Sequence, residues 1–307
     1  MQKGFGRIWS FARELYAEWQ ADGCFQLAAA LSYYTVFAIA PMVTIMINVT
    51  SYFLGEEAVT GELYGQLSGL LGSEGAESIQ TMVKNSHRQQ QGLLATVIGT
   101  ATLLVSATGA FAALQNALNK IYQVKVDEAG GVWVVIFNRL LAFGMLLCIG
   151  LLLAASLLLE VVFSALRDFL RELLADYAVY LIAALQRAVS LGVSTLLFAL
   201  LFKFLPDVSI PWRRVWPGAL LTAVSFTVGR TLLGYYLGQS NLASTYGAAA
   251  SVVLIMLWVN YSAWILFVGA EYIDVYMRRR NETIEPAYYA KKFRYGSRRE
   301  NPENADS

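Results

Sequence analysis

Long charge-free apolar runs dominate the pattern of hydrophobic and polar positions along the chain. Asp, Glu, Lys and Arg do not occur in residues 23–55, 89–119, 140–159 and 231–270, and two further apolar segments, 177–202 and 215–237, hold one arginine each. A helix needs about 20 apolar residues to cross the hydrocarbon core of a bilayer. The pattern therefore predicts six transmembrane helices, at about residues 27–54, 92–118, 134–159, 177–205, 215–237 and 247–274.

The segments outside these helices are amphipathic or basic. Residues 1–26 carry apolar side chains at spacings of three and four, which predicts a helix: Phe5, Ile8, Trp9, Ala12, Tyr16 and Trp19. Such a helix either lies in the membrane interface or packs on the ends of the bundle. Residues 56–91 predict two amphipathic surface stretches, and residues 278–307 form a basic tail, expected to be disordered or bound to anionic phospholipid.

Composition supports the same class of protein. The 307 residues are 57% hydrophobic and only 15% charged, and the mean hydropathy is +0.49. These values are too apolar for a water-soluble globular enzyme. We therefore expect an all-α, polytopic integral membrane protein with a membrane domain at 27–277.

The basic residues predict the orientation of the helices. If the N-terminus is cytoplasmic, seventeen Lys and Arg residues fall in cytoplasmic segments, and four fall on the opposite side, namely Lys84, Arg88, Arg167 and Arg171. Cytoplasmic loops of membrane proteins carry an excess of Lys and Arg. Both termini are therefore expected in the cytoplasm.

Several kinds of chemistry lack the residues they need. The one histidine is His87, the two cysteines, Cys24 and Cys148, have different predicted depths, and no phosphate-binding GxxxxGK[ST] motif occurs. A histidine-rich zinc site, a disulfide framework and a nucleotide-driven pump are thereby disfavoured. We expect no metal, no cofactor and no enzymatic activity.

Polar groups inside the predicted helices are the candidate site, because charge within a bilayer is costly. Arg187 lies near the predicted midplane with Ser190 and Ser194 on its helix face, and Arg230 lies in the outer half of the following helix. Either these arginines bind an anion, such as a lipid phosphate or a carboxylate, or they are structural. In the structural alternative, Arg187 is satisfied by backbone carbonyls, serines or Asn260.

Two ion pairs are expected at the helix ends. Arg230 is predicted to pair with Glu160, and Arg139 with Glu271, because each pair is assigned a similar depth. Glu271 has two interpretations, a bundle-stabilising ion pair and a proton-coupling carboxylate, of which the first is favoured. Asn260 shares a helix face with Glu271.

Three motifs in order resemble the YihY/BrkB family of bacterial inner-membrane proteins. They are the stretch from Ala28 to Pro41, the stretch from Ser106 to Phe111 followed by Leu114-Gln115 and Leu118-Asn119-Lys120-Ile121, and Tyr246-Gly247 leading to Trp258-Val-Asn-Tyr261 and Gly269-Ala-Glu271. The resemblance extends over about residues 10–277. It implies an integral membrane protein of six helices in the bacterial inner membrane.

The resemblance also implies a role at the cell envelope. Family members have been linked with serum resistance or with export of lipid precursors, and an older label as a tRNA-processing ribonuclease does not suit a chain with a single histidine. No nucleic-acid partner is therefore expected. The residues that match the family pattern are Tyr33, Tyr34, Pro41, Asn119, Tyr246 and Gly247.

Taken with the intramembrane arginines, these features predict a transporter or flippase-like protein for an anionic lipid or another anionic amphiphile. The alternative is a non-transporting membrane scaffold or an envelope-assembly partner. The sequence specifies neither the substrate nor the oligomeric state.

Overall fold

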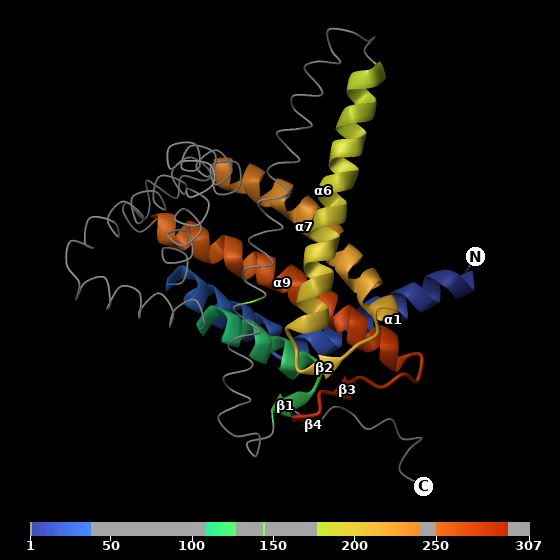
Figure 1. Ribbon diagram of the computed structural model, residues 1–307. Helices are drawn as coiled ribbons and strands as arrows, with labels where there is room; N and C mark the ends of the chain where they lie inside the picture. Colours follow the sequence, from blue (N-terminus) through green and yellow to red (C-terminus); the bar gives the residue numbers. More distant parts are fainter. Residues whose placement is uncertain (1, 38–108, 127–143, 145–176, 240–249, 294–307) are drawn as a thin grey trace, which may run out of the picture.

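The computed structural model describes residues 2–37, 109–126, 144, 177–239 and 250–293. Long helices form most of this part of the chain. They are α1 (Gln2–Ala21), an apolar helix at Cys24–Phe37, a helix at 109–121, α6 (Tyr177–Phe204), α7 (Trp212–Gln239) and α9 (Ala250–Arg278). Figure 1 shows α7 and α9 running side by side, while α6 rises away from them at a steep angle.

Three of the predicted membrane helices correspond closely to observed ones. The prediction 177–205 matches α6, the prediction 215–237 lies within α7, and 247–274 overlaps α9, which continues to Arg278. Two stretches within these helices are long and apolar enough to span a membrane, Ala184–Phe204 and Val252–Arg278. The predicted helix 134–159 and the surface segment 56–91 lie outside the described residues, as do most of 27–54 and 92–118.

A short turn at Gly23 separates the first two helices. α1 ends at Ala21, and the next helix begins at Cys24, three residues earlier than expected. Gly23 has a φ of +70°, a left-handed conformation that glycine adopts without steric cost. Its carbonyl accepts the amides of Gln26 and Leu27, so the turn also starts the second helix. The sequence placed this boundary near residue 26, since nothing in the apolar pattern distinguishes a short turn here.

Four short strands modify the expected all-α fold. β1 (Val124–Val126) pairs antiparallel with β4 (Ala290–Lys292), and β2 (Val208–Ser209) pairs antiparallel with β3 (Glu285–Pro286). Each pair joins segments that are far apart in the sequence, so no local pattern could reveal it. Residues 285–292 belong to the predicted basic tail, and the expectation of disorder is therefore wrong for this part.

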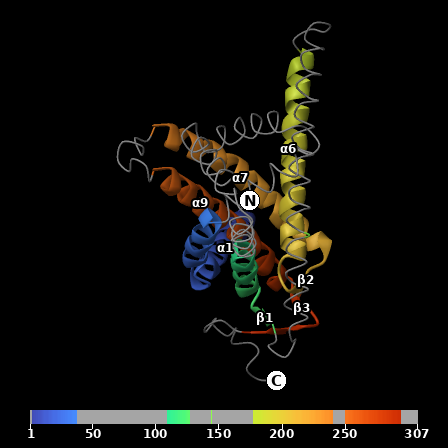
Figure 2. The same ribbon diagram turned by 60° about the vertical axis from the view of Figure 1, so that its left-hand side comes forward.

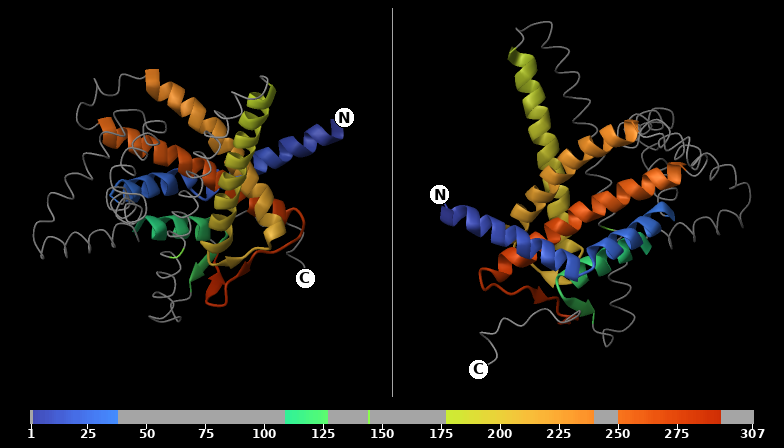
Figure 3. Two further views of the ribbon diagram at one scale, coloured as in Figure 1. Left: turned by 45° about the horizontal axis from the view of Figure 1, so that its top comes forward. Right: turned by 180° about the vertical axis from the view of Figure 1, so that it is seen from behind.

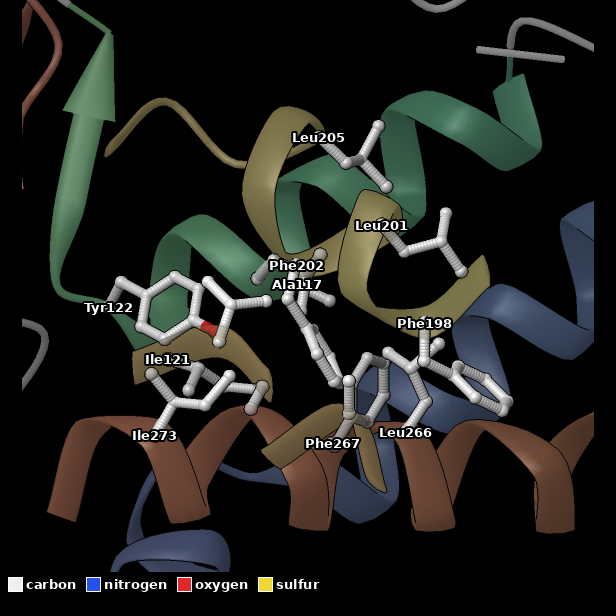
Figure 4. Close-up of a cluster of buried hydrophobic side chains, with 14 of the residues drawn as sticks. Ala117, Ile121, Tyr122, Phe198, Leu201, Phe202, Leu205, Leu266, Phe267 and Ile273 are labelled. Carbon is white, nitrogen blue, oxygen red and sulfur yellow. The ribbon is translucent and has the colours of Figure 1, made fainter. Parts of the chain in front are cut away.

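All four strands lie at one end of the molecule, which we call the strand end. Here α6 ends, α7 begins and α9 ends, and α1 crosses the last turns of α9 (Figures 2 and 3). A buried cluster lies beside these helix ends and takes side chains from several of them, including Phe198 and Phe202 of α6 and Phe267 and Ile273 of α9 (Figure 4). The best-packed region of the described chain is therefore near the strand end.

Small residues bring α7 and α9 into close contact. A Cβ atom added at Gly269 would lie 1.8 Å from Oγ1 of Thr222, and one added at Gly218 would lie 2.4 Å from Cγ1 of Ile273. A Cβ atom at Gly229 would lie 2.5 Å from Tyr261. Helices within a membrane associate mainly through such close packing, because lipid offers no hydrophobic driving force. The three glycines therefore determine how closely these helices approach.

Candidate functional site

A buried carboxylate organises the strand end. Asp207 follows Pro206 in the connection between α6 and α7, and it is only 2% exposed. Nε2 of Gln115 donates to both carboxylate oxygens at 3.2 and 3.3 Å, and Nδ2 of Asn119 donates to Oδ2 at 2.6 Å. The hydroxyl of Tyr289 donates to Oδ1 at 2.9 Å. We call these four residues the polar junction.

The backbone of Asp207 is satisfied as fully as its side chain. Its amide donates to Oδ1 of Asn119 at 2.8 Å, and its carbonyl accepts the amide of Ala287 at 2.9 Å. Asn119 therefore uses both ends of its amide on one residue, which fixes the orientation of that side chain. Buried charge is tolerated only with such dense hydrogen bonding. The polar junction thus joins the helix at 109–121, the α6–α7 connection and the C-terminal segment.

The environment of Tyr289 changes its acidity. Burial raises the pKa of the Tyr289 phenol, and the negative charge of Asp207 and the hydrogen bond to it raise that pKa further. The phenol therefore stays a hydrogen-bond donor at neutral pH. This protonation state is the one that the carboxylate of Asp207 requires.

Residues 279–293, which we call the C-terminal strap, hold the helix ends together. Glu282 accepts two hydrogen bonds from Arg214 of α7, one of them from Nε at 2.6 Å. The same interaction raises the pKa of Arg214. β3 and β4 of the strap complete both small sheets. The strap therefore contacts both the start of α7 and the strand that follows the helix at 109–121.

α9 ends in a left-handed turn that starts the strap. Asn281 has a φ of +55°, and the amide of Glu282 donates to the carbonyl of Met277 at 3.0 Å. Asparagine is one of the few non-glycine residues that adopt this conformation readily. The turn sends the chain back across the strand end.

Glu271 lies in a second buried polar group near the start of the Cys24–Phe37 helix. Its side chain is fully buried, and Sγ of Cys24 lies 3.9 Å from its Oε1. Asp22 is also buried, and a Cβ atom at Gly23 would lie 3.6 Å from Nζ of Lys120. The predicted partner Arg139 lies outside the described residues, so the Arg139–Glu271 ion pair stays a prediction.

The predicted anion-binding residues lie on three different helices. Arg187, Ser190 and Ser194 belong to α6, Arg230 belongs to α7 and Asn260 belongs to α9. Arg187, Ser190 and Arg230 are exposed, and Ser194 and Asn260 are partly buried. Within the described residues, no hydrogen bond joins any two of these side chains, so the structure does not assemble them into one pocket.

The residues of the family pattern have different surroundings. Asn119 is buried in the polar junction. Tyr33 and Tyr34 are exposed on the Cys24–Phe37 helix and contact each other edge to face, with ring centroids 5.8 Å apart. Pro41, Tyr246 and Gly247 lie outside the described residues, as does Glu160, the predicted partner of Arg230.

Sequence reasoning missed most of the polar junction. The motifs of the sequence include Gln115 and Asn119 but neither Asp207 nor Tyr289. One signal was available, since Gln115 and Asn119 are four residues apart and thus share a helix face. A second signal was the charge of Asp207, since the other residues between α6 and α7, 205–211, are uncharged. Across the described ranges, no group of three or more His, Cys, Asp or Glu side chains could hold a metal ion.

These features define a mostly helical membrane protein whose helix ends are fastened by a polar junction and a strap. Comparison of the sequence with known families then identifies it further. The chain belongs to the family described as virulence factor BrkB, whose pattern matches residues 15–292. The resemblance inferred from the motifs is thereby confirmed.

Curated relatives carry a consistent description. The chain is 28% identical over 268 residues to a UPF0761 membrane protein from Teredinibacter turnerae, an alignment that covers 87% of this chain and 60% of the relative. It is 28% identical over 264 residues to a UPF0761 membrane protein from Neisseria meningitidis serogroup B, covering 86% and 62%. The chain thus spans about three fifths of the length of these relatives. No solved structure shows a significant match.

Proposed function

We propose that this membrane protein is a transporter or flippase-like protein for an anionic lipid or another anionic amphiphile. The observation that supports the proposal is the exposure of Arg187 on α6 and of Arg230 on α7, two helices of 28 residues each. Among the described residues, neither guanidinium has an acidic partner. A charged group at such a position is costly unless it meets an anion, and guanidinium matches phosphate and carboxylate geometry.

The positions of the two arginines along their helices agree with each other. Arg187 lies 17 residues before the end of α6 at Phe204, and Arg230 lies 18 residues after the start of α7 at Trp212. At 1.5 Å per residue, each is roughly 26 Å along its helix from the strand end. The two arginines therefore lie at similar distances along their helices from the strand end, and that distance is longer than the midplane position predicted for Arg187 implies.

We further propose six transmembrane helices, both termini in the cytoplasm and a location in the bacterial inner membrane. In support, basic residues assigned to cytoplasmic segments gather at the strand end, including Lys203, Arg214 and Arg278. An excess of such residues favours the cytoplasmic side. Accessibility of single cysteines at the strand end to a membrane-impermeant maleimide, in whole and in permeabilised cells, tests this orientation.

The transport proposal is tested with purified protein in liposomes that contain fluorescent phosphatidylglycerol or fluorescent phosphatidylcholine. Movement between leaflets should favour the anionic lipid and should be lost in Arg187→Leu. The loss should be smaller in Arg187→Lys, which keeps the positive charge but lacks the planar guanidinium that makes two parallel hydrogen bonds. The matched control is Arg213→Leu, which removes an exposed arginine at the strand end. Equal movement in Arg187→Leu and the control, from folded protein, would contradict the role of Arg187.

A membrane scaffold or envelope-assembly partner is the second candidate function. The observation that favours it is the strap, which gathers exposed charged residues at the strand end, including Arg279, Glu285 and Lys292. Removing residues 281–307 does not separate the two functions, because Glu282 and Tyr289 belong to the described contacts. Removing residues 294–307 leaves those contacts intact. A scaffold that uses the basic tail then loses its association, whereas a transporter retains turnover.

A further inference from the structure

α1 has one face that is fixed to the protein. Phe11 packs edge to face on Tyr272 of α9, with ring centroids 5.2 Å apart. Glu14 accepts from Arg278 at 3.0 Å and from Arg279 at 2.7 Å, and Glu18 lies 2.9 Å from Arg278. These contacts fix the rotation of α1 about its own axis.

The opposite face of α1 is apolar and exposed. Ile8, Trp9 and Tyr16 are 71%, 67% and 60% exposed. At 100° per residue, the centre of this stripe lies about 150° from the face that carries Phe11, Glu14 and Glu18. Large apolar side chains gathered in this way usually mark a surface that contacts a membrane or a partner.

The depth of α1 favours a membrane. The apolar span of α9 ends at Arg278, and Tyr272, which contacts α1, lies six residues earlier. Six residues of helix correspond to about 9 Å. α1 therefore crosses α9 within the last 10 Å or so of the span, the depth at which amphipathic helices insert between headgroups and acyl chains.

A second set of aromatic residues marks the same end of the molecule. Phe204 at the end of α6 contacts Trp212 at the start of α7, with ring centroids 5.9 Å apart, and Trp212 contacts Trp216 at 6.3 Å. All three are exposed. Trp and other aromatic side chains are enriched at the two surfaces of a bilayer. The strand end thus carries two aromatic surfaces on separate elements.

We propose that α1 lies in the membrane surface at the strand end, with Ile8, Trp9 and Tyr16 inserted among lipid headgroups and the upper acyl chains. Arg13, which is exposed and flanks the stripe on the same helix, then meets lipid phosphates. Only Asp22 and Gly23 separate α1 from the apolar helix Cys24–Phe37, so an apolar segment follows the stripe directly in the chain. A soluble protein partner would have no access to this depth.

The test measures the depth of a nitroxide spin label in the reconstituted full chain. In a background with Cys24→Ala and Cys148→Ala, one variant carries the label at Ile8→Cys and the matched control carries it at Ala17→Cys. Residue 17 is exposed and lies nine residues further along the helix, which places it on the opposite side of α1. The vesicles contain phosphatidylcholine and phosphatidylglycerol in a ratio of three to one.

Relaxation by oxygen, which concentrates in the bilayer, is compared with relaxation by a water-soluble nickel chelate. The ratio of oxygen to nickel accessibility should be several-fold larger at position 8 than at position 17. Equal ratios with high nickel accessibility at both positions would overturn the proposal, because the stripe would then lie in water. Protection at position 8 that disappears when the protein is diluted into excess lipid would also overturn it, in favour of a second copy of the chain. The measurement needs no transport, so its result is independent of the proposed function.

Discussion

The strand end and the far halves of α6 and α7 are stabilised in different ways. At the strand end, Asp207 alone takes part in hydrogen bonds with four other residues, and the strap adds two sheets and a bidentate ion pair. Farther from that end, residues such as Leu185 and Leu232 are exposed, and helix contacts depend on small residues such as Gly229. Polar fastening at one end leaves the rest of each helix free to meet lipid or another helix.

This difference indicates where substitutions act on the fold and where they act on function. Hydrogen bonds to a buried charge contribute about 1.5–3 kcal/mol each, whereas exposed positions on a helix contribute little. Substitutions at the polar junction should therefore lower the stability of the whole bundle. Substitutions at Arg187 and Arg230 should change activity with little loss of stability.

The largest expected effect comes from Asp207→Ala. The change leaves the donors of Gln115, Asn119 and Tyr289 without their acceptor in a buried site, which should lower the free energy of unfolding by about 3 kcal/mol or more. Unfolding by denaturant in detergent micelles, followed by tryptophan fluorescence, measures the change. The control is Glu285→Ala, an exposed carboxylate of the same strand end, and it should leave the midpoint almost unchanged. Similar midpoints for the two variants would show that the polar junction does not stabilise the bundle.

A smaller effect should follow from Gly269→Ala at the contact of α7 with α9. The new methyl group would collide with Thr222 and would lie 3.0 Å from Cζ of Phe202, which should cost roughly 1–3 kcal/mol. The matched control is Gly192→Ala on α6, where a Cβ atom meets nothing within 4 Å. That variant should be neutral, or more stable by up to about 1 kcal/mol, because alanine favours helix. Thermal unfolding of both variants in the same detergent measures whether the unfolding temperature falls for Gly269→Ala and stays the same or rises for Gly192→Ala.

The smallest effect at neutral pH is expected for Tyr289→Phe, which removes one hydrogen bond to the Asp207 carboxylate and should cost about 1.5 kcal/mol. Its pH dependence is more informative. Because the pKa of Tyr289 is raised in the folded protein, the folded state holds its proton more tightly than the unfolded state does. This contribution to stability is fully present below the ordinary phenol pKa of about 10 and is lost as the pH rises above it.

Denaturant midpoints measured from pH 8 to pH 11 test that dependence. The unchanged protein should lose stability more steeply above pH 10 than Tyr289→Phe does. Tyr288→Phe is the matched control, since Tyr288 is the neighbouring residue and is 92% exposed. The denaturant midpoint of Tyr288→Phe should equal that of the unchanged protein at every pH. Parallel curves for all three proteins would contradict the assigned hydrogen bond.

The helices were largely predictable because their pattern is local. Apolar runs with a single arginine each predicted the extents of α6 and α7 to within a few residues, since the cost of desolvating charged side chains limits how far an apolar helix extends. The pairing of Val124–Val126 with Ala290–Lys292 was not predictable. Both segments are short, and their partners lie more than a hundred residues away.

The polar junction was only partly predictable, because it too depends on contacts between segments far apart in the sequence. Asn119 could be singled out because it lies in a motif, but its partners Asp207 and Tyr289 come from two distant segments that only the folded chain brings together. A single carboxylate in a connection has no spacing pattern that would mark it. By contrast, Arg187 and Arg230 stand out in the sequence, because a charge within an apolar run is conspicuous without any knowledge of the fold.

The strap also has a consequence for the order of synthesis. β1 and β2 are made before α7 and α9, whereas their partners β3 and β4 emerge only after both helices. Until then the carboxylate of Asp207 lacks Tyr289, and Arg214 lacks Glu282. In a chain whose synthesis stops between α9 and β3, the helices could form, but β1 and β2 at the strand end would have no partner strands. Such a product would expose those unmatched polar groups and edges to quality-control proteases.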